Sequence, residues 1–116
     1  MVLVLAVLPG LDVGILPAQE NPEIAHLLDF VASSQCRFMR NGKWYSAAQG
    51  REHLERKYGH VEHRIRNAED FIEKVASESS MTSRPYRVRC GEHEMPTARW
   101  LTEELHRFRQ SMGNTR

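Results

Sequence analysis

Residues 36–46 read CRFMRNGKWYS, two runs rich in strand-forming residues on either side of Asn41-Gly42. Asn-Gly in a two-residue loop supplies the positive φ angles that a type I′ turn requires. The stretch therefore predicts a β-hairpin, and the rest of the domain is interpreted outward from it.

The hairpin turn also sets which side chains share a face. With a two-residue loop, Phe38 pairs with Tyr45 and Met39 pairs with Trp44. Because successive side chains in a strand point to opposite faces, Cys36, Phe38 and Tyr45 lie on one face and Met39 and Trp44 on the other. Both faces carry aromatic side chains, so either the hairpin is covered on both sides or one face is a binding surface.

Apolar residues at helical spacing predict four helices around this hairpin. The expected ranges are 20–33, 47–58, 67–76 and 97–112. Asn21 is the expected N-cap of the first helix and Asn67 that of the third, and Gly59 is expected to end the second. Alternation at residues 86–90 predicts one further strand, with Tyr86, Val88 and Cys90 on the buried side. The order α-β-β-α-α-β-α indicates a single small α+β domain with an antiparallel sheet.

Composition narrows the class of protein. The chain has 116 residues, 41% of them hydrophobic and 27% charged, with a formal net charge of +1. These values are typical of one globular domain and argue against a dedicated nucleic-acid-binding protein, which carries a large basic excess. Apolar runs are shorter than the roughly 18 residues that span a bilayer.

The first 18 residues resemble a secretory signal peptide. Val2 to Leu11 is an uncharged apolar run, and Ala18 is a small residue at a suitable cleavage point. Asp12 and the missing basic start of the segment depart from the usual pattern, so a buried N-terminal strand or helix is the alternative. We expect residues 1–18 to be a signal peptide, residues 19–116 to form the domain, and the mature protein to lie in the periplasm.

Cys36 and Cys90 are the two cysteines of the chain. In an exported chain such a pair is typical of one disulfide. The bridge would join the first strand of the hairpin to the last predicted strand. The alternative is two buried free thiols in a reducing compartment.

Catalytic and metal-binding signatures are weak. His60 and His63 are one residue short of the HxxEH spacing, so zinc held by His53, His60 and His63 is an unspecific alternative. The chain has no GxSxG, GxGxxG or P-loop pattern. We therefore predict no metal, no other cofactor and no catalytic residue.

Three long stretches together resemble a known family. They are SSQCRFMRNGKWYSAAQGREHLERKYGH at 33–60, NAEDFIEKVASESSMTSRPYRV at 67–88 and WLTEEL at 100–105. The set resembles the YfeK-like family, small periplasmic proteins with a DUF5329-type domain of unknown function. The resemblance implies export and brings no activity, ligand or catalytic residue. Relatives tend to carry glycine where this chain has Ser83, which leaves open whether that turn uses a left-handed residue.

Several polar residues in these stretches have no evident role in the core. The weak binding candidates are Arg40, Trp44, His53, Lys57, Ser77, Ser79 and Ser80. If the polar ones converge, they would form a small pocket suited to an anion or a peptide carboxylate. Otherwise the serines cap the preceding helix, and Arg40 and Lys57 pair with local carboxylates.

Two hypotheses for function follow from these candidates. The first is a non-enzymatic binding or accessory module of the envelope, whose partner is a protein or a small anionic ligand. The second is a small hydrolase or metal-dependent enzyme that uses His53 with the Ser77–Ser80 cluster. Neither hypothesis involves nucleic acid or a membrane span in the mature chain.

Overall fold

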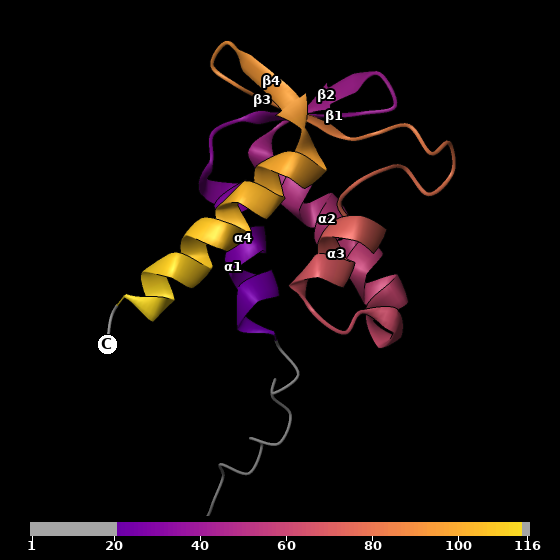
Figure 1. Cartoon of the computed structure of the whole chain (residues 1–116). Coiled ribbons are helices and arrows are strands. Elements are labelled where there is room, and N and C mark those ends of the chain that lie inside the picture. The colour runs from indigo at the N-terminus through magenta and orange to yellow at the C-terminus, as the bar shows by residue number, and fades with distance from the viewer. Residues whose placement is uncertain (1–20, 115–116) are drawn as a thin grey trace, which may run out of the picture.

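The computed structural model describes residues 21–114, which fold into four α-helices and one four-stranded antiparallel sheet (Figure 1). The elements in chain order are α1 (Pro22–Ser33), β1 (Arg37–Arg40), β2 (Lys43–Tyr45), α2 (Ala47–Val61), the short 3₁₀ helix η3 (Glu62–Arg64), α3 (Ala68–Lys74), β3 (Arg87–Cys90), β4 (His93–Pro96) and α4 (Thr97–Gly113). The predicted α+β class is confirmed. The predicted signal peptide, residues 1–18, lies outside the described residues.

The first hairpin has the predicted turn and register. Asn41 and Gly42 have φ angles of 51° and 82°, so both central residues of the turn are left-handed. Phe38 pairs with Tyr45 and Met39 with Trp44, as the turn length requires. Local turn chemistry is therefore sufficient to align these strands.

A fourth strand, β4, was not predicted. The sheet order is β2-β1-β3-β4, and β3 and β4 form a second hairpin through Gly91 and Glu92. Gly91 takes a positive φ of 66°, as a glycine at the first central position of a type II′ turn does. The strand has the sequence HEMP. Because β4 is an edge strand with two exposed residues, it lacks the alternation of apolar and polar residues that predicts a strand.

The predicted end of α2 at Gly59 is wrong. The helix continues to Val61 and is followed directly by η3. Gly59 keeps a right-handed backbone, and a Cβ there would meet no atom within 4 Å. Val61 and Ile65 pack against the core beyond it, so tertiary contacts carry the helix through the glycine.

The two asparagine caps are confirmed. Asn21 accepts hydrogen bonds from the backbone N–H groups of Glu23 and Ile24, and Asn67 accepts one from that of Asp70. The Asp70 carboxylate in turn accepts from the backbone and guanidinium of Arg66, one residue before the cap. These hydrogen bonds hold the pKa of Asp70 below its usual range.

All four helices lie on one side of the sheet (Figure 1). Their apolar stripes meet the inner sheet face, which carries Phe38 and Val88, to form the core. The most deeply buried large side chains are Leu27, Val31, Phe71, Val75, Val88, Leu101 and Leu105. None of the helices among residues 21–114 is long and apolar enough to cross a membrane.

Cys36 and Cys90 form the predicted disulfide, with an S–S distance of 2.07 Å. They stand next to the paired residues Arg37 and Arg89, so the bridge ties β1 to β3 where the two strands pair. The alternative of two free thiols is therefore wrong.

Candidate functional site

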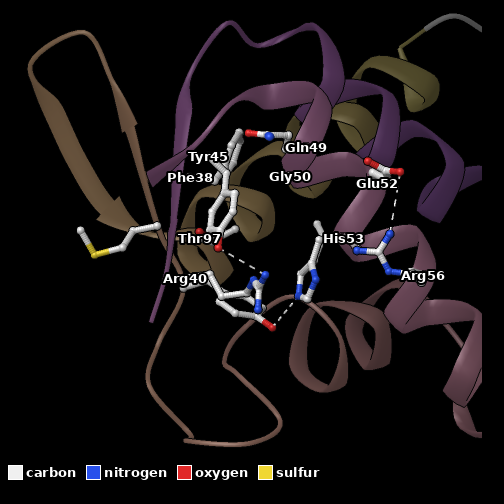
Figure 2. A pocket seen from close by; sticks show the side chains of 12 residues that line it. Phe38, Arg40, Tyr45, Gln49, Gly50, Glu52, His53, Arg56 and Thr97 are labelled. Atoms are coloured by element: carbon white, nitrogen blue, oxygen red, sulfur yellow. Dashed lines mark hydrogen bonds and ion pairs between the residues drawn. The ribbon is translucent and has the colours of Figure 1, made fainter. Parts of the chain in front are cut away.

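A cavity of about 190 Å³ lies between the inner face of the first hairpin and α2 (Figure 2). Its walls come from β1, β2 and α2, together with Tyr86 before β3 and Thr97 at the start of α4. Phe38, Tyr45 and Leu54 supply apolar surface, whereas the remaining lining side chains are mostly polar.

Arg40 is the unpaired cation of this cavity. It is the last residue of β1, and strand alternation places it on the same face as Phe38. Its guanidinium stacks 5.1 Å from the centre of the Tyr45 ring and donates a hydrogen bond of 3.4 Å to the Tyr45 hydroxyl. Within residues 21–114 no carboxylate pairs with Arg40, whereas Arg56 at the rim pairs with Glu52 at 3.8 Å. An anion that enters the cavity would meet a charge that the fold leaves unused.

His53 faces Arg40 across the cavity (Figure 2). Its Nε2 atom lies 3.0 Å from the Tyr86 hydroxyl. Burial, followed by repulsion from Arg40, Lys57 and Arg56, lowers the pKa of His53 to about 4. The imidazole is therefore neutral near pH 7 and adds no charge to the site.

Lys57 approaches the same group from behind Tyr86. Its ammonium donates to the Glu78 carbonyl at 2.6 Å and to the Tyr86 hydroxyl at 3.2 Å. Burial lowers the pKa of Lys57 and raises that of Tyr86. When Lys57 donates to the Tyr86 oxygen, the Tyr86 proton can be donated to Nε2 of a neutral His53. Lys57, Tyr86 and His53 thus form one chain of hydrogen bonds that leads from Lys57 to the cavity wall.

Thr97 contributes a hydroxyl without a partner. The residue is 2% exposed, and its Oγ1 is the buried side-chain polar atom without a hydrogen bond among residues 21–114. It is the first residue of α4, whose N-cap, Pro96, has no side chain to cap the helix and whose first turn holds no acidic residue. The partial positive charge of this 17-residue helix therefore begins beside the cavity.

The serine cluster does not join this cavity. Ser77 donates to the Glu73 carbonyl, and the Ser79 hydroxyl accepts hydrogen bonds from the backbone of Met81 and Thr82. Ser79, Ser80 and Lys57 line a second hollow of about 360 Å³. Of the polar residues that would form one pocket if they converged, only Arg40 and His53 line this cavity, and Lys57 is connected to it through Tyr86.

The serines instead build the loop before β3. Asn41 in the hairpin turn donates to the Ser79 hydroxyl and accepts from that of Thr82, which attaches the loop to the hairpin. Ser83 has a φ of 62°, so this turn does use a left-handed residue.

Trp44 lies on the opposite face of the sheet from the cavity. It is half-buried, and the guanidinium of Arg89 stands 5.5 Å from its ring centre. Within residues 21–114 no three His, Cys, Asp or Glu side chains gather as metal ligands do, so His53, His60 and His63 do not converge.

Sequence reasoning did not select Tyr86 or Thr97 for this site. Tyr86 was assigned to the core by strand alternation, and Thr97 was assigned as the start of a helix. Both assignments are correct, but neither shows that the residue lines a cavity. The sequence pattern that points to Thr97 is a threonine after a proline, at the start of a helix whose N-cap residue has no side chain that can cap it.

Comparison with known proteins gives a family and one curated relative. Residues 18–109 match a family described as "Family of unknown function (DUF5329)". The chain is 40% identical over 70 residues to "Uncharacterized protein YfeK" of Salmonella typhimurium, a stretch that covers 60% of this chain and 58% of that protein. No solved structure matches the chain.

Proposed function

The chain belongs to the DUF5329 family, whose function is unknown, and on that premise we propose that it is a non-enzymatic binding module of the bacterial envelope that takes up a small organic anion. The observation that carries the proposal is one cavity lined both by Arg40, whose guanidinium has no carboxylate partner, and by Thr97, whose buried hydroxyl has no hydrogen bond.

The energetics of these two groups favour an occupant. A buried hydroxyl without a hydrogen bond costs roughly 1–3 kcal/mol, so native proteins rarely keep one without a ligand or water. An anion accepts hydrogen bonds from both groups and is further stabilised by the N-terminus of α4. A ligand carboxylate would pair with the Arg40 charge, and a ligand oxygen that reached Thr97 would satisfy its buried hydroxyl.

The size and walls of the cavity restrict the ligand. Its 190 Å³ is below the roughly 300–1,000 Å³ of sites for drug-sized molecules. Phe38, Tyr45 and Leu54 suit a short apolar body better than a fully hydrated ion. A carboxylate with a short carbon chain combines both requirements.

The contacts of His53 favour binding over serine hydrolysis. A serine nucleophile needs a hydrogen bond to its base. His53 instead bonds to Tyr86, whereas Ser77 and Ser79 bond within their own loop and the end of α3. The neutral His53 is better placed as a hydrogen-bonding group in the cavity wall.

Two features support export. A disulfide is typical of proteins in oxidising compartments, and the run Val2 to Leu11 has the character of a signal peptide. We expect cell fractionation to place the protein in the periplasm, with a mature N-terminus at Gln19 by mass spectrometry. Cytosolic protein that retains Met1 would contradict export without touching the binding proposal.

The binding proposal is tested by titrating acetate, propionate, butyrate and inorganic phosphate into the ¹⁵N-labelled full chain. Arg40→Met removes the charge, Thr97→Val removes the hydroxyl at constant shape, and Arg99→Met on the exposed face of α4 is the matched control. Because a hydrogen bond to a charged group contributes about 1.5–3 kcal/mol, Arg40→Met should weaken carboxylate binding by roughly 10- to 150-fold.

Thr97→Val separates ligand binding from stability. The substitution removes an unsatisfied polar atom, so it should stabilise the ligand-free protein by about 1 kcal/mol while weakening carboxylate binding. Unchanged affinity in both cavity variants, or an equal loss in Arg99→Met, would refute the assignment of the site.

A further inference from the structure

The sheet has a second face, away from the helices, that no described helix covers (Figure 1). Strand pairing and alternation place on this outer face Arg37, Met39, Trp44, Arg87, Arg89 and Glu94. None of these six residues belongs to the core, and three of them, Arg37, Arg89 and Glu94, are exposed.

The outer face carries an excess of positive charge. Arg87 pairs with Glu94 at 2.7 Å. Arg37 and Arg89 have no carboxylate partner within residues 21–114, and the sheet register sets them directly opposite each other on β1 and β3. Like charges opposite each other across two strands destabilise a sheet. On the other side of Arg89 the register sets Glu94, but its carboxylate pairs with Arg87, so the fold leaves the two cations beside the disulfide without an ion pair.

An aromatic and a thioether side chain accompany this pair. The Arg89 guanidinium carbon lies 5.5 Å from the centre of the Trp44 ring. Met39 lies opposite Trp44 in the pairing of β1 with β2. Both are half-buried. Arginine, tryptophan and methionine are enriched in protein interfaces, and arginine and tryptophan are among the residues that contribute most to binding.

We propose that the outer face docks an acidic segment of a partner protein, with a carboxylate between Arg37 and Arg89 and an apolar side chain against Trp44 and Met39. The carboxylate would relieve the repulsion between the two arginines. The short apolar strip beside them fits the side chain two positions along an extended peptide, because residues i and i+2 share a face.

Charge and symmetry argue against two other occupants. Membrane surfaces with anionic lipids are recognised by clusters of about 4–8 basic residues, and this face offers two unpaired ones. A second copy of the chain would bring the same two cations against each other. An acidic protein segment fits both the sign and the small number of charges.

The test uses an acetylated and amidated peptide of repeating Glu-Ser-Leu-Ser, whose glutamate and leucine side chains share a face when it is extended, titrated into the ¹⁵N-labelled full chain. The indole signal of Trp44 should shift, whereas that of Trp100, which is 8% exposed in the core, should stay in place. The same peptide with lysine in place of glutamate should not bind. Vesicles of phosphatidylglycerol provide the membrane comparison.

Arg37→Gln and Arg89→Gln are the variants, and Arg64→Gln on η3 is the control with the same change of charge. Each outer-face variant should weaken peptide binding about fivefold without lowering the melting temperature, because it also removes the cross-strand repulsion. Butyrate binding in the cavity should not change, which separates this proposal from the proposed function.

Several results would overturn the inference. They are no binding of the acidic peptide, an equal loss in Arg64→Gln, a shift of Trp100 without Trp44, or a Trp44 shift with vesicles alone. The last of these would assign the face to a membrane surface.

Discussion

Reduction of the Cys36–Cys90 bridge should destabilise the domain by about 4 kcal/mol. The two cysteines are 54 residues apart in sequence, and the loop-entropy relation for a crosslink of that length gives this value at 25 °C. Small domains have a total unfolding free energy of about 5–15 kcal/mol, so the bridge supplies a large share of it.

The expected change in melting temperature is large. In domains of 60–100 residues, 1 kcal/mol corresponds to about 4–8 °C, so the reduced protein should melt roughly 16–32 °C below the oxidised one. Calorimetry or circular dichroism of the full chain, with and without a phosphine reductant, measures this difference. Cys36→Ala combined with Cys90→Ala provides a version that cannot reoxidise.

A shift of less than about 5 °C would refute the reasoning, because the unfolded chain would then gain little freedom from reduction. Thiol titration under denaturing, non-reducing conditions should find no free thiol. Reduction of the disulfide should leave the slope of the denaturant transition in the range typical of a cooperatively folded domain. Such a slope would show that the reduced protein is less stable but still folded.

Three further predictions concern single residues. Ser83→Gly should stabilise the protein by about 0.5–1 kcal/mol in chemical denaturation, because it relieves a left-handed backbone at φ 62°. Gly59→Ala should stabilise α2 by about 0.5–1 kcal/mol, whereas Gly50→Ala should destabilise by about 1 kcal/mol, because its Cβ would lie 3.1 Å from the Phe38 ring. The pKa of His53 falls from 6.5 to about 4 on folding. Between these pH values His53 is protonated in the unfolded chain and neutral in the native protein, so the unfolded state is favoured as the pH falls. This group alone should lower the free energy of unfolding by about 1–2 kcal/mol as the pH falls from 6.5 to 4, and His53→Gln should remove that part of the pH dependence.

The parts of the fold that the sequence predicts are those decided by neighbouring residues. Asn41-Gly42 sets the turn, the turn sets the register, and alternation then assigns each face. The two asparagine caps are equally local. β4 and the last turn of α2 depend instead on contacts between segments that are distant in sequence. Neither the sequence HEMP of β4 nor the residues after Gly59 carry a local pattern that predicts a strand or a continued helix.

The candidate site divides in the same way. Arg40 and His53 were selected because burial alone did not explain them, and both line the cavity. Ser77 and Ser79 are candidates on the same ground, yet their hydroxyls satisfy backbone groups, as clustered serines after a helix commonly do. Thr97 shows the opposite case, since its polar atom matters only because three-dimensional packing leaves it without a partner.

β1 connects the two proposed surfaces, because its four side chains alternate between them. Phe38 and Arg40 face the cavity, and Arg37 and Met39 face outward. The disulfide holds the strand at one end, and the turn at the other end is attached to the Ser79 loop. A substitution at one of these side chains should therefore affect one surface, whereas reduction of the disulfide should loosen the strand and weaken butyrate and peptide binding together. Reduction that weakened only peptide binding would show that the bridge orients Arg37 and Arg89 without supporting Arg40, and the strand would then not act as a rigid unit.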